Sequence, residues 1–123
     1  MRSVGGAPIV RAMGRSKKIL LAYDGSEAGR RALDAAAEMM GYGSTLAVVG
    51  AAKTRSTDPL GDAWRYLSDR QVLARFINGN GHPAETVLNT AVEIGADVIV
   101  IAALNGSTES VIQRAPCDVL VVR

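Results

Sequence analysis

The chain has 123 residues, a length typical of one domain. Hydrophobic residues make up 48% of it and charged residues 21%, which excludes a disordered chain, a collagen and a coiled coil. The longest apolar run, residues 98–104, is far too short to span a membrane. The single cysteine, Cys117, and the single histidine, His82, are too few ligands for a structural metal site.

The charge is unevenly distributed along the chain. Residues 1–18 hold five basic residues and no acidic one, whereas the rest holds nine basic and twelve acidic residues. Residues 1–16 show no helical or strand period, so we interpret them as a flexible extension of a domain that covers residues 17–123. Because the domain has no basic stripe with interleaved aromatic residues, we expect neither nucleic acid nor membrane as a partner.

The domain begins with a short apolar run, residues 19–22, typical of a strand that is buried on both faces. Ser26 then offers an N-cap for a helix that extends to about Met40. The apolar face of this helix comprises Ala32, Leu33, Ala36, Ala37 and Met40. A second strand is predicted over residues 45–49.

A polar segment that contains a proline and a glycine follows the second strand. We then predict a short helix over residues 63–69, with Trp64 and Leu67 directed inward. A third strand is predicted over residues 72–77, and its Arg75 favours a position at the edge of the sheet.

The next helix has clear boundaries in the sequence. Pro83 suits the first position of a helix, and Gly95 is a residue type that commonly ends one. The predicted buried stripe of this helix comprises Val87, Leu88, Ala91 and Val92.

Three further elements follow: a strand over residues 98–101, a short helix that Ser107 caps and that runs to Arg114, and a strand over residues 119–122. Helices that alternate with apolar strands predict an α/β fold with right-handed crossovers. The predicted sheet is parallel and five-stranded, in the order 3-2-1-4-5. A ligand is then expected at the carboxyl ends of strands 1 and 4, near Asp24 and the loop of residues 103–107.

Three stretches of the sequence stand at corresponding strand and helix positions: residues 18–26 (KILLAYDGS), 81–100 and 114–122. Together and in this order they resemble the universal stress protein family. The resemblance implies a three-layer Rossmann-like fold of the adenine nucleotide alpha hydrolase-like type for residues 17–123. It also implies a cytoplasmic, usually homodimeric stress-response module, and some members of the family bind ATP or AMP.

The resemblance also implies a set of nucleotide-binding positions. Asp24 would lie beside the ribose, and backbone groups of Ala51 would lie near the adenine. The full set comprises Ala22, Tyr23, Asp24, Ala51, Ala102, Gly106 and Ser107. The alternative for Asp24 is a loop aspartate that accepts hydrogen bonds from nearby backbone N–H groups. The alternative for Ser107 is a helix cap rather than a phosphate ligand.

The phosphate loop of the family is reduced in this sequence. Nucleotide-binding members carry a glycine, two residues, a second glycine, nine residues and then Gly-Ser or Gly-Thr, and the glycines let backbone N–H groups approach phosphates. Here Ala102 replaces the first glycine, and the second glycine and most of the spacer are missing. Only Gly106 and Ser107 resemble the closing pair.

Two functions follow from this reduced loop. The first is a non-catalytic stress-response module that acts through dimerisation and protein contacts, with weak or no ATP binding. The second is a sensor that holds an adenine nucleotide, ATP or AMP, in a reduced site at the carboxyl ends of strands 1 and 4.

Other classes of function fit the residues less well. Nucleophilic catalysis needs a base beside the nucleophile, but His82 lies far from Ser26 in the sequence, so we expect no enzyme. A phospho-receiver domain would need an acceptor aspartate after the third strand, where Asn78 stands. A flavin-binding domain would need a phosphate loop after the first strand, where Asp24 would repel a phosphate.

The fifth strand is the predicted dimer interface. Its residues Val119, Leu120, Val121 and Val122 carry no charge, although an exposed sheet edge is normally protected by charge or proline. Antiparallel pairing of two such strands about a two-fold axis would satisfy both edges, and the family resemblance implies the same mode. In the alternative, the N-terminal extension or the last helix covers this edge in a monomer.

Overall fold

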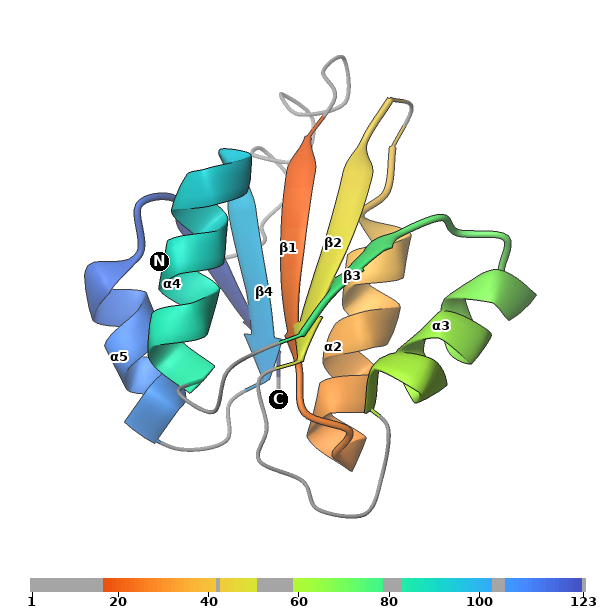
Figure 1. Cartoon of the computed structure of the whole chain (residues 1–123), viewed down its shortest axis with the longest axis horizontal. Helices are drawn as coiled ribbons and strands as arrows, with labels where there is room; N and C mark the ends of the chain where they lie inside the picture. Colours follow the sequence, from red (N-terminus) through yellow and green to blue (C-terminus); the bar gives the residue numbers. More distant parts are fainter. Residues whose placement is uncertain (1–16, 42, 51–58, 79–82, 103–105, 123) are drawn as a thin grey trace.

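The computed structural model describes residues 17–41, 43–50, 59–78, 83–102 and 106–122. Strands and helices alternate along these residues. Their bounds are β1 (Lys18–Tyr23), α2 (Glu27–Glu38), β2 (Thr45–Gly50), α3 (Pro59–Asp69), β3 (Arg75–Ile77), α4 (Pro83–Ile94), β4 (Val98–Ala102), α5 (Gly106–Arg114) and β5 (Asp118–Val122). All pairs of neighbouring strands are parallel, and the order β3-β2-β1-β4-β5 confirms the predicted topology (Figure 1).

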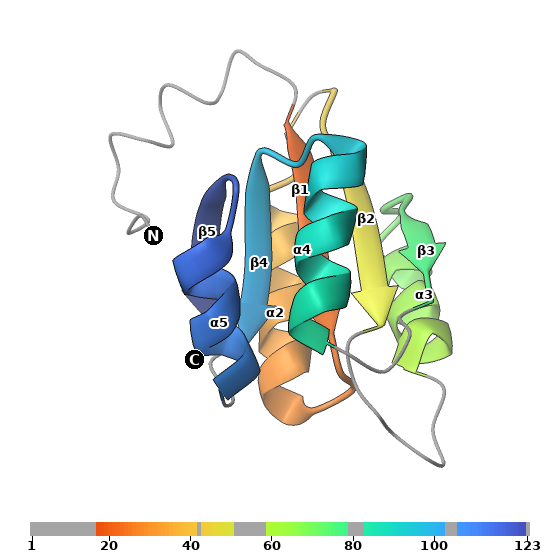
Figure 2. The same ribbon diagram turned by 60° about the vertical axis from the view of Figure 1, so that its left-hand side comes forward.

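Helices cover both faces of the sheet because its central strands are apolar on both sides. Helices α2 and α3 lie on one face and α4 and α5 on the other, as Figure 2 shows. In β1, Leu21 and Tyr23 pack toward α2 and α3, whereas Leu20 and Ala22 pack toward α4 and α5. Among the described residues, every helix is too short or too polar to cross a membrane.

The predicted ends of two helices are confirmed. The Ser26 side chain caps α2, and its Oγ atom accepts a hydrogen bond from the Gly29 backbone N–H at 2.9 Å. Gly95 follows the last residue of α4 with a φ angle of +67°, a left-handed conformation that favours glycine.

Helices α2 and α3 are joined by a polar contact across their outer side. The Tyr66 hydroxyl donates a hydrogen bond to Asp34 Oδ1 at 2.7 Å. The Arg70 guanidinium lies 3.8 Å above the centre of the Tyr66 ring and 3.9 Å from Asp34 Oδ1. Since these groups are partly exposed, the ion pair adds little stability, and the hydrogen bond and the stacked ring set how the helices face each other.

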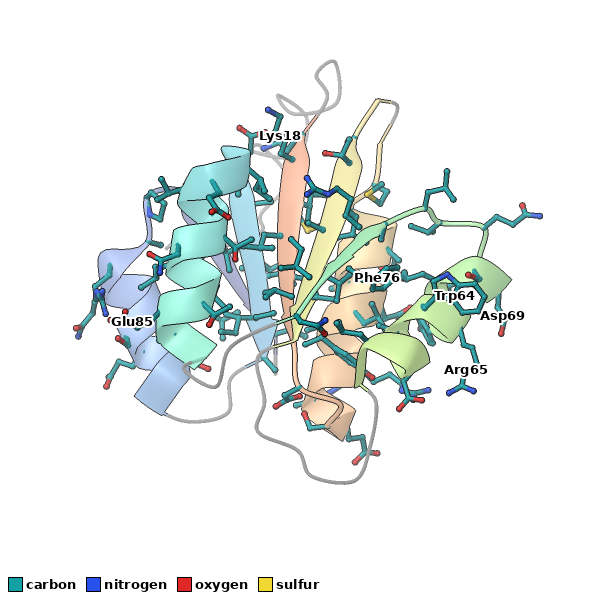
Figure 3. The ribbon with its side chains drawn as sticks, in the orientation of Figure 1. Lys18, Trp64, Arg65, Asp69, Phe76 and Glu85 are labelled. Atoms are coloured by element: carbon teal, nitrogen blue, oxygen red, sulfur yellow. The ribbon has the colours of Figure 1, made fainter. Side chains whose placement is uncertain are left out.

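Two apolar side chains that were expected to point inward are exposed instead. Trp64 has 56% of its surface exposed, and Figure 3 shows it on the outer side of α3. Helix α3 begins at Pro59, earlier than predicted, and buries Ala63 and Leu67 one turn apart, so the next residue after Ala63 turns away from the core. Val92 is 68% exposed because the apolar stripe of α4 continues to Ile94.

The third strand is shorter than predicted, since only residues 75–77 pair with β2. The cause lies at the end of α3, where Gln71 has a φ angle of +59°. The Gln71 N–H donates to the Ser68 carbonyl at 2.9 Å and the Val72 N–H to the Leu67 carbonyl at 2.8 Å. These bonds close the helix in a Schellman motif and take the Val72 N–H away from the sheet.

Candidate functional site

The carboxyl ends of β1 and β4 lie side by side at one edge of the sheet. Ala22 pairs with Ile101 in the parallel register, so the last residues of the two strands end together. The first turns of α2 and α5 lie at this same edge, at the bottom of Figure 1. The connection from β1 leads through α2 to β2 on one side, whereas β4 on the other side of β1 is reached from β3 through α4. The strand order therefore reverses between β1 and β4, which is where ligands bind in open α/β sheets.

The predicted site residues divide between the core and the edge. Ala22, Tyr23 and Ala102 are buried, and the Ala22 and Tyr23 side chains lie on opposite faces of the sheet. Only backbone atoms of these residues are therefore available to a ligand at the edge. Asp24 is half-buried and follows β1 directly.

The other three predicted positions lie after β2 and β4. Ala51 lies outside the described residues. Gly106 and Ser107 are the first two residues of α5. The helix therefore begins two residues earlier than an N-cap at Ser107 predicts.

Asp24 is held by Ser26 at the start of α2. Its Oδ1 atom accepts the Ser26 backbone N–H at 2.9 Å and the Ser26 hydroxyl at 2.6 Å. These are the local hydrogen bonds that the alternative interpretation of Asp24 predicted. Both of these bonds are accepted by Oδ1, and no described residue donates a hydrogen bond to Oδ2.

Gly29 is a residue that sequence reasoning missed. A Cβ atom added there would lie 2.5 Å from Asp24 Oδ1 and 3.2 Å from Ser26 Oγ. The available signal was a glycine within the first turn of a helix, where it is about 1 kcal/mol less favourable than alanine. The close approach of the Asp24 carboxylate explains why glycine is present at this position.

Thr108 is a second residue that the sequence did not single out. Its side chain is buried, and its Oγ1 atom donates a hydrogen bond to the Ala102 carbonyl at 2.7 Å. This bond ties the first turn of α5 to the last residue of β4. The Ala102 carbonyl is thus engaged by the protein itself.

The Tyr23 hydroxyl lies behind this edge, beneath α2 and α3. It is buried, and no described residue lies in hydrogen-bonding geometry with it, although the Arg30 guanidinium is near enough to act on it. Burial raises the pKa of Tyr23 and outweighs the lowering by Arg30. The hydroxyl therefore remains protonated at neutral pH.

The described residues hold no group of three His, Cys, Asp or Glu side chains that could bind a metal ion. Cys117 is a free, half-buried cysteine. Burial raises the pKa of its thiol, and the carboxylates of Asp118 and Asp97 raise it further. The thiol is therefore protonated, and poorly nucleophilic, at neutral pH.

Similar proteins are found among curated sequences and among solved structures. No family model matches the chain. A curated protein of Thermus aquaticus, named universal stress protein in QAH/OAS sulfhydrylase 3'region, is 32% identical over 136 residues, which cover 87% of this chain and 98% of that protein. Since 87% of 123 residues is about 107, the relative has additional residues within the matched region.

Solved structures share the fold. A protein of the universal stress protein family from Burkholderia pseudomallei is 29% identical, with a TM-score of 0.65 over 85% of this chain and 94% of its own. A universal stress protein in complex with cAMP is 20% identical, with a TM-score of 0.68 over 87% and 97%. One from Archaeoglobus fulgidus in complex with dAMP is 19% identical, with a TM-score of 0.67 over 89% and 98%.

Proposed function

This chain belongs to the universal stress protein family, and we propose that it is a non-catalytic, cytoplasmic stress-response module that acts as a homodimer and through contacts with other proteins. We assign this role to residues 17–123, with residues 1–16 as an extension. In this proposal ATP binds weakly or not at all.

The short connection between β4 and α5 carries this proposal. Only three residues separate Ala102 from the start of α5, and the Thr108 hydroxyl bonds back to the Ala102 carbonyl. A loop that wraps a triphosphate needs several free backbone N–H groups, and glycines that let them approach the phosphates. Each donor that is lost costs about 1.5–3 kcal/mol toward a charged acceptor.

A second candidate function is a site for an adenine nucleotide with a single phosphate. The observation that favours it is the Asp24 carboxylate, whose Oδ2 atom receives no hydrogen bond from the described residues. A ribose hydroxyl would donate to this oxygen, and backbone groups of the other proposed residues would contact the rest of the nucleotide. Those residues are Ala22, Tyr23, Ala51, Ala102, Gly106 and Ser107. The cAMP and dAMP complexes of proteins with this fold support a ligand of that size.

Calorimetry of the full chain with ATP, AMP and cAMP tests both functions. We expect ATP to bind more weakly than AMP, because AMP does not need the missing phosphate donors. Losing two such donors would weaken ATP binding by about two to four decades. A dissociation constant for ATP at or below micromolar would contradict the first proposal.

The second function is tested by Asp24→Ala, with Asp69→Ala on the exposed end of α3 as a matched control. We expect Asp24→Ala to weaken AMP binding and Asp69→Ala to leave it unchanged. Equal affinity of all three proteins for AMP would rule out a site built on Asp24.

A further inference from the structure

We infer that Gly29 is a positioning residue that sets where the Asp24 carboxylate lies. The inference rests on the nucleotide site proposed above, and it deepens that site by naming the residue that controls its carboxylate. Gly29 does this by having no side chain, so that the carboxylate packs directly over the first turn of α2.

A run of hydrogen bonds links the first turn of α2 to the Asp24 carboxylate. The Gly29 N–H donates to Ser26 Oγ at 2.9 Å, and the Ser26 hydroxyl donates to Asp24 Oδ1 at 2.6 Å. The Ser26 N–H donates to the same Oδ1 atom at 2.9 Å. The first turn of the helix and the carboxylate are therefore one rigid unit, whose members lie within six residues of the chain.

The space for Oδ1 exists only because position 29 is glycine. A Cβ there would approach Oδ1 to 2.5 Å, which is closer than real Cβ contacts come. Ser26 Oγ at 3.2 Å and Tyr23 Cδ1 at 3.4 Å bound the same space on its other sides. A side chain at this position would therefore displace the carboxylate and break its two hydrogen bonds to Ser26.

The displacement has a chemical consequence for binding. An ionised carboxylate only accepts hydrogen bonds, and Oδ1 already accepts two of them. A ligand that reaches Asp24 must therefore donate to Oδ2, as a ribose hydroxyl does. With Oδ1 held by Ser26, the direction in which Oδ2 faces the ligand is fixed, and Gly29 controls that direction.

The test is a double-mutant cycle of Gly29→Ala and Asp24→Ala in the full chain, with AMP as the probe. Gly41→Ala is the matched control, because a Cβ there would meet only Ser44 Oγ, at an ordinary 3.8 Å. We expect Gly29→Ala to weaken AMP binding about tenfold, as expected for one hydrogen bond to a charged group, and Gly41→Ala to change it less than about twofold.

Thermal midpoints give a second readout that needs no ligand. Alanine favours a helix over glycine, so Gly29→Ala is expected to raise the midpoint when Asp24 is already alanine. With Asp24 present, the same change is expected to lower the midpoint, because the carboxylate is displaced. A change of sign between the two backgrounds is the signature of Gly29 acting through Asp24.

The outcomes separate the inference from the function on which it rests. If the unsubstituted chain does not bind AMP, the nucleotide site fails and the midpoints alone decide the role of Gly29. If Gly29→Ala raises the midpoint in both backgrounds, or binds AMP as the unsubstituted chain does, the inference is wrong.

Discussion

Tyr23 is the largest completely buried side chain in the described part of the chain; its ring packs in the apolar core, and its hydroxyl lies within electrostatic reach of Arg30. No described residue is in hydrogen-bonding geometry with it. A buried hydroxyl without a partner costs about 1–3 kcal/mol of desolvation. The hydroxyl therefore lowers the stability of the fold, whereas the ring stabilises it.

We expect Tyr23→Phe to raise the free energy of unfolding by about 1 kcal/mol, because it removes the hydroxyl and keeps the ring. Tyr66→Phe is the matched control. It removes a hydroxyl that donates to Asp34 at 2.7 Å, so it is expected to lower the free energy of unfolding by about 1 kcal/mol. Urea denaturation at pH 7 measures both changes, and a loss of stability in Tyr23→Phe would show that its hydroxyl is bonded in solution.

Tyr23→Phe is also expected to change how the free energy of unfolding depends on pH. Burial raises the pKa of Tyr23 above its ordinary value of 10.0 in the folded chain. The unfolded chain therefore loses this proton first, so stability is retained below pH 10 and falls as the pH rises above it. This fall is expected to be smaller in Tyr23→Phe. The pKa values of Cys117 and Tyr66 are also raised, but these residues affect the pH dependence of stability equally in the unsubstituted chain and in Tyr23→Phe.

For individual side chains, the sequence predicts contacts that are local and misses those that depend on packing. The bonds between Asp24 and Ser26 follow from an Asp-Gly-Ser turn, so they were predictable. The importance of Gly29 depends on how closely the carboxylate approaches the helix, which no periodicity encodes. The orientation of Trp64 depends on where α3 begins.

Among the elements, the two edge strands differ in how well they are protected. The strand order places β3 and β5 at the edges, as predicted. Strand β3 is short and carries Arg75, whereas the last three residues of β5 are only half-buried and apolar. A homodimer joined through β5 would cover them, and this interface stays a prediction.

We expect a proline in β5 to convert the dimer to a monomer if it removes an outward N–H. Successive residues in a strand direct their N–H groups to opposite sides, so Val121→Pro and Val122→Pro form a matched pair. One of them removes a donor to the partner, and the other removes a donor to β4. Sedimentation of both variants gives the mass, and circular dichroism checks the fold.

The expected result is that one proline variant is folded and monomeric while the unsubstituted chain is a dimer. If the unsubstituted chain sediments as a monomer at tens of micromolar, or if both folded variants remain dimeric, β5 is not the interface.

The elements that the sequence predicted well are those with strong apolar runs. Strands β1, β2 and β4 are buried on both faces, so their apolar residues run together and mark their positions. Strand β3 lies at an edge and is half-buried, so its pattern is weak. The first residues of the predicted strand belong instead to the Schellman motif that ends α3. This motif usually has glycine at the position with positive φ, and here that position is Gln71, so the sequence does not reveal it.

For the whole molecule, the alternation of helices and apolar strands was sufficient to predict the order of the sheet, since right-handed crossovers leave few arrangements. The function of residues 1–16 was not predictable to the same extent. They carry basic residues without an apolar period, so neither packing nor pairing follows from their sequence.

We expect deletion of residues 1–12 to leave the thermal midpoint of the chain unchanged within about 1 °C, because their sequence shows no apolar period. Differential scanning calorimetry of the full and shortened chains makes the comparison. A fall of several degrees would show that Pro8, Ile9 and Val10 pack against the domain.

The central position of β1 also determines the order in which the fold is completed during synthesis. β1 leaves the ribosome before every other strand, yet it pairs with β4, where Leu20 lies opposite Ile99. Until β4 has been made, one side of this central strand has no partner, and closing so long a loop is entropically slow. Synthesis must therefore pass residue 98 before the centre of the sheet can be completed.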